Sequence, residues 1–106
     1  MDDPKEWYNR GLRALDRKEY DAAIDHFTQA IEKQTDYAEA YLGRGVAKDY
    51  LKAYTKAIAD YDQAIDLDPK HARAYYNRGN AKRKLGDHKE AIADYDQAIA
   101  LDPEFA

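Results

Sequence analysis

A repeat of 34 residues constrains this 106-residue chain more than any other feature of its sequence. Residues 38–71 and 72–105 are identical at 20 of 34 positions, and the nonapeptide Ala57–Ile65 recurs unchanged as Ala91–Ile99. Residues 4–37 follow the same frame more loosely. Three copies therefore fill nearly the whole chain, and the fold must place equivalent side chains in similar surroundings at a constant step.

Within each copy, apolar and small residues recur at helical spacing. One such stripe of an amphipathic helix, in the second copy, consists of Tyr54, Ala57, Ile58, Tyr61, Ala64 and Ile65. A second helical stretch precedes it and ends near Leu51, or near Leu85 in the third copy, where Gly86 favours a turn. Asp68-Pro69 and Asp102-Pro103 then end the second helix, because proline cannot donate the next helical hydrogen bond. Each copy is predicted to be a helix-turn-helix unit, which gives an all-α fold of six helices.

The copies share small and aromatic residues at fixed positions. The fourth, eighth, twentieth, twenty-fourth and twenty-seventh positions hold, copy by copy, Trp7, Tyr41, Tyr75; Gly11, Gly45, Gly79; Ala23, Ala57, Ala91; Phe27, Tyr61, Tyr95; and Ala30, Ala64, Ala98. With Pro69 and Pro103 near the copy ends, this pattern resembles the tetratricopeptide repeat. The resemblance implies three hairpins stacked as a right-handed α-solenoid. It also implies one domain over residues 1–106, with repeats 4–37, 38–71 and 72–105 and no C-terminal capping helix.

Arginine stands at the seventh position of every copy, where the family usually has an aliphatic residue. Antiparallel packing brings this position opposite the twenty-third, so a carboxylate there would compensate the charge. We therefore expect two ion pairs, Arg44 with Asp60 and Arg78 with Asp94. In the first copy His26 holds the twenty-third position, which leaves Asp25 as the expected partner of Arg10. Recurrence in every copy favours a structural tie over an anion-binding site.

Two features leave the state of assembly open. The turn Leu51-Lys52-Ala53-Tyr54 holds neither glycine nor proline, so its flanking helices could fuse and exchange between two chains, although a turn held by packing is the simpler interpretation. No further hairpin covers the last helix, so we expect Ile92, Ile99 and Leu101 at the surface. Such an open end either promotes association or indicates that the sequence is part of a longer array, and the sequence does not separate the two. A swap of helices, or association through the open end, would make the chain a homo-oligomer.

The family resemblance also implies a concave groove lined by the first helix of each repeat. The groove candidates are Lys5, Tyr8, Asn9, Leu12, Leu42, Val46, Asp49, Tyr50, Arg73, Tyr76, Asn77, Asn80, Arg83 and Lys84. The same repeat positions also include Leu15, Asp16, Glu39 and Gly43. The first two copies supply a mostly apolar half, and the third supplies cations and amides. The expected ligand is a peptide segment with apolar anchors followed by acidic residues or a free carboxylate.

One branch of the family binds the acidic tails of heat-shock chaperones with a clamp of lysine, asparagine, asparagine, lysine and arginine. The corresponding positions here hold Tyr8, Leu12, Gly43, Arg73 and Asn77. Only Arg73 keeps the required charge, so the multi-donor capture of a terminal carboxylate is missing. We therefore expect no binding of such chaperone tails.

Composition argues against other functional classes. A formal net charge of -4 opposes binding to a phosphate backbone, so no nucleic-acid partner is expected. The chain has no cysteine, and its histidines, His26, His71 and His88, lie at unrelated repeat positions, so no metal site is expected. It also lacks serine and any phosphate-binding loop, so we expect no catalytic residue and no cofactor. No signal-peptide pattern or apolar membrane span is seen, which favours a cytoplasmic location without membrane contact.

The sequence thus predicts a non-catalytic scaffold for protein–protein interaction, with a peptide groove that is apolar at one end and basic at the other. The alternative is a self-assembling structural unit, either a dimer, a domain swap or a filament, formed through the uncapped terminal helix. The identity of the partner is not encoded in these patterns.

Overall fold

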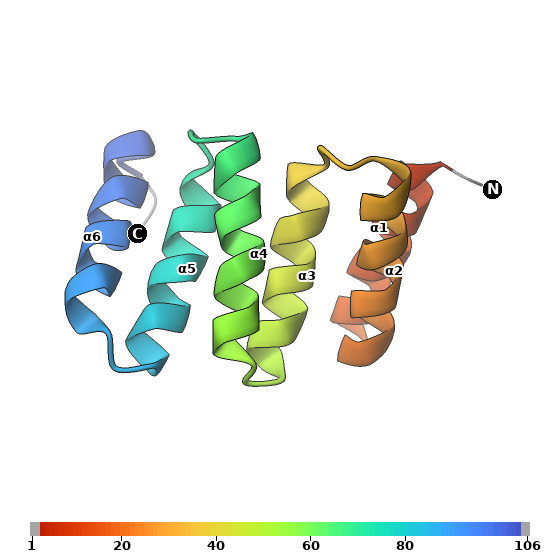
Figure 1. Cartoon of the computed structure of the whole chain (residues 1–106), viewed down its shortest axis with the longest axis horizontal. Coiled ribbons are helices and arrows are strands. Elements are labelled where there is room, and N and C mark those ends of the chain that lie inside the picture. Colours follow the sequence, from red (N-terminus) through yellow and green to blue (C-terminus); the bar gives the residue numbers. More distant parts are fainter. Residues whose placement is uncertain (1–2, 105–106) are drawn as a thin grey trace.

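Six α-helices joined by short turns make up residues 3–104, the part of the chain that this computed structural model describes. In chain order they are α1 (Pro4–Asp16), α2 (Tyr20–Lys33), α3 (Ala38–Tyr50), α4 (Tyr54–Leu67), α5 (Ala72–Lys84) and α6 (His88–Leu101). The helices form a row of antiparallel hairpins, with α1 and α2 at one end and α6 at the other (Figure 1). The all-α solenoid of six helices predicted from the repeat is confirmed.

Each helix packs only against near neighbours in the row. Within hairpins α1 packs on α2, α3 on α4 and α5 on α6, whereas α2 meets α3 and α4 meets α5 between hairpins. The first helices also touch one another, α1 with α3 and α3 with α5. The result is an elongated body of 42 × 25 × 21 Å. Apolar surface is therefore buried by adjacent hairpins, and no central core gathers all six helices.

The interior of each hairpin depends on a glycine that faces an aromatic ring. A Cβ atom on Gly11 would lie 2.5 Å from the ring of Phe27, and one on Gly45 would lie 2.6 Å from the ring of Tyr61. Both rings are buried, with exposed fractions of 0% and 1%. Phe27 also meets Gly43 of the next hairpin, where a Cβ would lie 2.6 Å away. Glycine at these positions therefore lets the helices approach closely.

All three turns inside the hairpins are closed by a residue in the left-handed conformation. Gly86 has φ of 87°, and the two non-glycine equivalents, Lys18 and Lys52, have φ of 62° and 66°. In the second hairpin the backbone N–H of Ala53 donates to the carbonyl of Lys48 at 2.9 Å. The α3–α4 turn is therefore formed, and the two helices do not fuse into the long helix that a domain swap would require.

Replacing Lys52 by glycine should raise the free energy of unfolding by about 0.5–1 kcal/mol, because the left-handed conformation strains every residue with a Cβ more than it strains glycine. Lys52→Ala keeps the Cβ and should gain nothing, which makes it the matched control. Urea unfolding followed by circular dichroism measures both variants. A Lys52→Gly protein less stable than Lys52→Ala would contradict the turn described here.

Candidate functional site

Two buried aspartates hold the arginines of the seventh repeat position. Arg44 donates from Nε and Nη2 to the carboxylate of Asp60 at 3.0 and 2.9 Å, and Arg78 donates in the same way to Asp94 at 2.9 and 2.8 Å. The aspartates are only 3% and 5% exposed. A lysine one turn further along each first helix adds a second cation, Lys48 and Lys82 respectively. Both ion pairs predicted from the sequence are confirmed.

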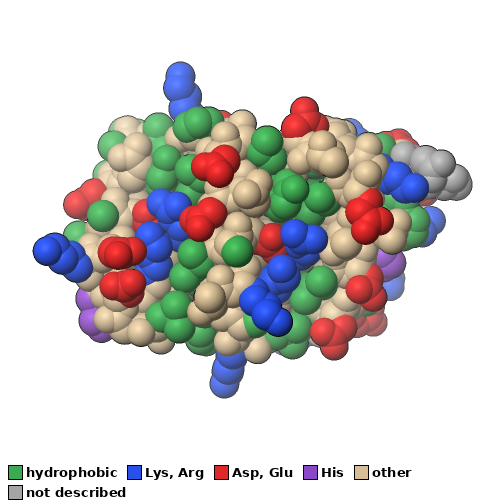
Figure 2. Space-filling view, in the orientation of Figure 1, with side chains coloured by type: hydrophobic (Ala, Val, Ile, Leu, Met, Phe, Trp, Pro, Cys, Tyr) green, Lys and Arg blue, Asp and Glu red, His purple; other side chains and the backbone are tan. Residues whose placement is uncertain are grey.

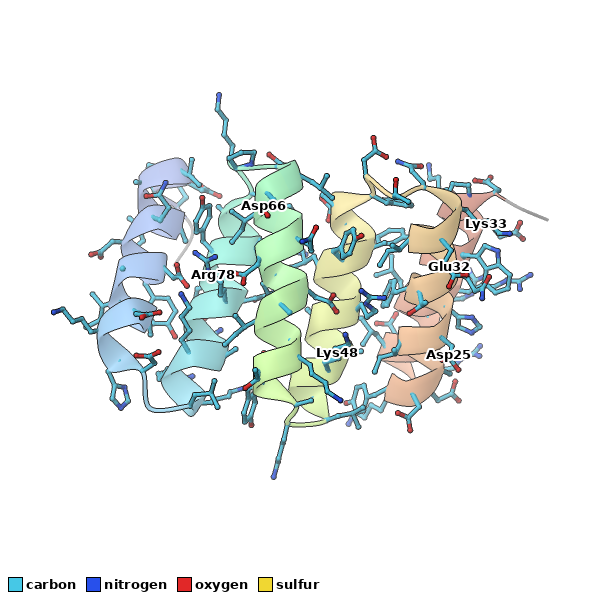
Figure 3. All side chains as sticks on the ribbon, viewed as in Figure 1. Asp25, Glu32, Lys33, Lys48, Asp66 and Arg78 are labelled. Carbon is cyan, nitrogen blue, oxygen red and sulfur yellow. The ribbon has the colours of Figure 1, made fainter. Side chains whose placement is uncertain are left out.

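The same arginines reach back to the preceding hairpin. Arg44 Nη1 donates to Thr28 Oγ1 at 3.1 Å, and Arg78 Nη1 donates to Asp62 Oδ1 at 2.8 Å. The hydrogen bonds of Arg78 to Asp94, and then to Asp62, raise the pKa of its guanidinium. Figure 3 labels Arg78 at its place beside α4 and α5. These bonds between hairpins were not predicted from the sequence, although a polar residue at the twenty-fifth position of each copy was their signal.

The first copy departs from this arrangement, and the prediction that Asp25 pairs with Arg10 is wrong. Arg10 Nη2 instead lies 3.8 Å from Glu6 of its own helix, and its guanidinium lies 4.9 Å from the ring centroid of Trp7. His26 takes the inward position, with its ring centroid 5.8 Å from that of Trp7. Asp25 precedes His26 by one residue, which turns it about 100° around α2 to an exposed site (Figure 3).

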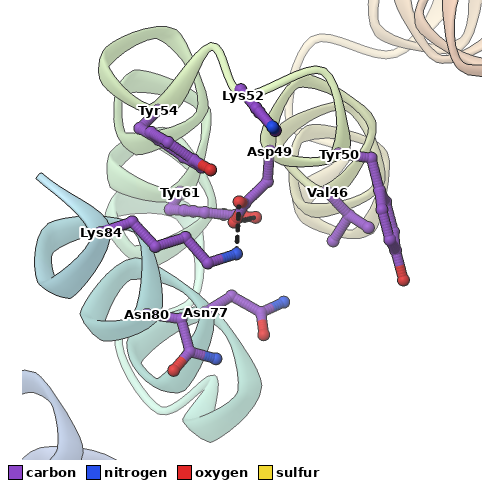
Figure 4. Close-up of a pocket in the computed structure, with 9 residues that line it drawn as sticks. All are labelled: Val46, Asp49, Tyr50, Lys52, Tyr54, Tyr61, Asn77, Asn80 and Lys84. Carbon is purple, nitrogen blue, oxygen red and sulfur yellow. Dashed lines mark hydrogen bonds and ion pairs between the residues drawn. The ribbon is translucent and has the colours of Figure 1, made fainter.

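A pocket of about 370 Å³ opens between the second and third hairpins. Six of its lining residues are groove candidates from the sequence: Val46, Asp49, Tyr50, Asn77, Asn80 and Lys84 (Figure 4). Three others were missed, namely Lys52, Tyr54 and Tyr61. They come from the α3–α4 turn and from α4, whereas the family resemblance predicts groove positions only on first helices. The structure thus brings candidates of α3 and α5 together around one cavity.

Asp49 organises the polar side of this pocket. It accepts a hydrogen bond from the Tyr61 hydroxyl at 3.2 Å and forms an ion pair with Lys84 Nζ at 3.2 Å (Figure 4). Lys84 also lies 5.4 Å from the ring centroid of Tyr54. The Asp49–Lys84 pair joins α3 to α5, so an acidic ligand that approaches Lys84 must compete with a carboxylate of the protein itself.

The inner face is the surface formed by the first helices of the three hairpins, α1, α3 and α5. Aromatic rings make up its apolar side. Tyr50 is 62% exposed and stacks on Tyr20 of the first hairpin, with ring centroids 4.9 Å apart. Tyr8 is half-buried, and its ring centroid lies 5.2 Å from that of Tyr37. Burial raises the pKa of Tyr8, and the negative charge of Glu39 raises it further. These contacts hold the rings in place before any ligand arrives.

Leu42 does not belong to this accessible surface, and its assignment to the groove is wrong. Its side chain is 4% exposed and packs in the apolar cluster shared by α3, α4 and α5. The cause is its place in the row: α3 lies between α1 and α5, which both pack against it, so its fifth repeat position is covered. At the same repeat position α1 has Tyr8, which is half-buried, and α5 has Tyr76, which is 36% exposed. Leu12, at the ninth position on α1, is 38% exposed.

At the third hairpin, Tyr95 fixes two candidate residues. Its hydroxyl donates to the amide oxygen of Asn80 and accepts a hydrogen bond from Arg83 Nε at 3.3 Å.

Among residues 3–104, Arg73 enters no ion pair. Four further candidates lie exposed on α1 and α5: Lys5, Asn9, Arg73 and Tyr76. This end of the inner face therefore carries an arginine held by a hydrogen bond and a second without a carboxylate partner.

Raising the pH above about 10 should destabilise the fold through Tyr61. Burial raises the pKa of this phenol strongly, and the charge of Asp49 and its hydrogen bond act in the same direction. The unfolded phenol ionises near pH 10, so above that pH the unfolded state loses a proton that the folded state keeps. The free energy of unfolding should then fall by about 1.4 kcal/mol per pH unit from this group.

Tyr61→Phe should flatten that decline between pH 10 and 11.5, whereas Tyr50→Phe, at an exposed ring, is the matched control. Chemical unfolding at several pH values measures both. Equal slopes for the unchanged chain and Tyr61→Phe would contradict this assignment.

The described residues offer few other kinds of site. In residues 3–104 no group of three or more His, Asp or Glu side chains is arranged to hold a metal ion. None of the helices in this range has both the length and the apolar composition needed to cross a bilayer. On the face drawn in Figure 2, the Lys and Arg side chains form separate groups beside acidic ones and give no continuous basic surface.

Comparison with known proteins places this geometry among repeat proteins. Family models described as tetratricopeptide repeat match residues 4–37 and 72–105, and one described as TPR repeat matches residues 50–86. No curated protein sequence is similar enough to count as a match. The similarity therefore rests on these models and on solved structures.

Three solved structures illustrate the likeness. The Arabidopsis OM64 TPR domain is 31% identical with a TM-score of 0.94, and the alignment covers 95% of this chain and 84% of that domain. MamA is 30% identical with a TM-score of 0.91 over 97% of this chain, which spans 60% of the MamA structure. The first TPR of Spaghetti (RPAP3), bound to the HSP90 peptide SRMEEVD, is 27% identical with a TM-score of 0.93, over 95% of this chain and 80% of that one.

Proposed function

This chain belongs to the tetratricopeptide repeat family, and from that premise we propose that it is a scaffold that binds a peptide segment of a partner protein along its first helices. The observation that carries the proposal is the pocket of about 370 Å³ between α3 and α5, which opens on the inner face. A similar domain, the first TPR of Spaghetti, is bound to a peptide in its solved structure. That likeness supports peptide binding as the mode of interaction, whereas the chemistry of the partner must be inferred from the side chains of this chain.

The apolar half of the proposed groove consists of Tyr8, Leu12, Val46 and Tyr50. Tyrosine offers a large contact area at a small cost in side-chain entropy, and Tyr50 is already stacked on Tyr20. An apolar side chain of the ligand would enter the pocket against Val46 and Tyr50, both of which line it. Anchoring of this kind gives most of the binding energy in peptide complexes.

The basic half consists of Arg73, Arg83 and Lys84 on α5. Arg73 and Arg83 lie ten residues apart on one helix, which separates their Cα atoms by about 15 Å. An extended peptide covers that distance in about four or five residues. Because Lys84 is engaged by Asp49, the two arginines are the cations that best suit a ligand with two acidic residues at this spacing.

The proposal includes no catalysis and no cofactor. The nine residues that line the pocket supply hydroxyls, amides and one ion pair, and they include no histidine, serine or cysteine. A nucleophile paired with a base is therefore missing from the cavity where a substrate would sit.

Reversing the charges of Arg73 and Arg83 should weaken acidic peptides about tenfold, because two exposed charge pairs of at most about 1 kcal/mol each are lost. The probes are array peptides with an apolar anchor and two acidic residues four or five positions apart, with affinity measured by fluorescence anisotropy. Lys56→Glu, at an exposed site on α4, reverses one charge away from the inner face, half the change in the double variant, and should leave affinity unchanged. Unchanged binding by the Arg73→Glu/Arg83→Glu protein would remove the basic half from the proposal.

The peptide SRMEEVD serves as a second probe. The positions that would form a carboxylate clamp hold Tyr8, Leu12 and Gly43, and Gly43 is buried against Phe27. We therefore expect SRMEEVD to bind far more weakly than the best array peptide. Equal affinities would show that the clamp residues are dispensable and would contradict this part of the account.

A further inference from the structure

The outer face of α6 exposes two isoleucines at repeat positions that the other hairpins cover. Ile92 is 59% exposed and Ile99 is 50% exposed, as expected from the sequence, while Leu101 is partly buried. At the position of Ile99, the first and second hairpins hold Ile31 and Ile65, which are only 8% and 9% exposed. Because the chain is periodic, its two internal interfaces reveal what kind of surface fits against α6.

Those interfaces use the same small residues. The helix that follows each covered isoleucine contributes two alanines seven residues apart, all with an exposed fraction of 0%: Ala40 and Ala47 in α3, and Ala74 and Ala81 in α5. The first pair shares an apolar cluster with Ile31, and the second pair shares one with Ile65. Small side chains at both places let the helix axes approach closely enough to bury the isoleucine.

An arginine between the two alanines adds a hydrogen bond across each interface. Arg44 donates to Thr28 of the preceding hairpin, and Arg78 donates to Asp62. The equivalent residue of the third copy is Asp96, which is exposed on α6 and enters no ion pair within residues 3–104. The α6 face therefore combines uncovered isoleucines with a carboxylate at the place where an arginine arrives in the second interface.

We propose that the α6 face, consisting of Ile92, Asp96 and Ile99, binds a helix of a partner with the pattern Ala-x-x-x-Arg-x-x-Ala. The alanines of this helix pack over the isoleucines, and its arginine donates to Asp96. The geometry continues the α2–α3 and α4–α5 interfaces by one further step, and the charges are complementary. This surface is separate from the peptide groove, so the inference about the α6 face can be tested independently of the proposed function.

A second copy of this chain is a poor occupant of the face. At the positions of the pattern, α1 has Glu6, Arg10 and Arg13, all exposed. The arginine is present, but charged side chains replace both alanines. Head-to-tail stacking of two copies would bury Glu6 and Arg13 against isoleucines, which costs more than the apolar contact returns.

The test uses the full chain and a synthetic peptide with the sequence of residues 72–84, cross-linked at the positions of Tyr76 and Asn80 to hold it helical. These two positions point away from the alanine face, because they correspond to groove positions. The matched control peptide has the sequence of residues 4–16, cross-linked at the positions of Tyr8 and Leu12. We expect saturable binding of the first peptide, with NMR shift changes confined to α6, and no binding of the second.

Variants of the chain locate the contact. Ile99→Lys should weaken the peptide at least about tenfold, because a charge replaces a buried apolar side chain. Asp96→Asn should weaken it about fivefold through loss of a charge-assisted hydrogen bond. Asp66→Asn, an exposed carboxylate on α4 (Figure 3), should have no effect.

Four outcomes would overturn the proposal. The first is no saturable binding by a peptide that circular dichroism shows to be helical. The second is equal binding of the control peptide, and the third is an affinity for the peptide that Ile99→Lys leaves unchanged. The fourth is growth of the unchanged chain in light scattering that Ile99→Lys abolishes, because the occupant would then be a second copy.

Discussion

The fold depends on an aromatic ring that lies against a residue without a side chain. Phe27 meets both Gly11 of its own hairpin and Gly43 of the next, so one ring sets the distance within a hairpin and between hairpins. A methyl group at either glycine would overlap the ring, and the helices would have to separate. Close spacing of the first helices follows from this contact, and with it the inner face on which the pocket opens.

Buried charges favour one register between the packed hairpins. Arg44 and Arg78 each bind an aspartate of their own hairpin and a polar side chain of the preceding one. A buried ion pair adds little net stability, but it disfavours arrangements that leave either charge unpaired. The arginines thereby select one register between neighbouring hairpins. The same geometry indicates what could bind the α6 face, because Asp96 in the third copy repeats the acceptor Asp62 and no following arginine donates to it.

The limits of prediction follow from the periodicity itself. The hairpins and the pair of Arg44 with Asp60 could be predicted, because an antiparallel hairpin fixes which repeat positions face each other. A rule written for one repeat cannot tell a central helix from a terminal one, so it placed buried Leu42 in the groove. Arg10 was given the wrong partner for another reason, because His26 takes the inward position on α2 and Asp25 is turned about 100° away from it. It also could not predict the left-handed Lys52, whose conformation is imposed by packing of α3 on α4, nor the ion pair of Asp49 with Lys84, which are 35 residues apart.

The central claim is that each hairpin is stabilised by its neighbours, and native-state hydrogen exchange measures this most directly. The account predicts the largest free energies of opening for amides of α3 and α4, which are covered on both sides, and clearly smaller ones for α6. Equal opening free energies along all six helices, or greatest protection in α6, would contradict it.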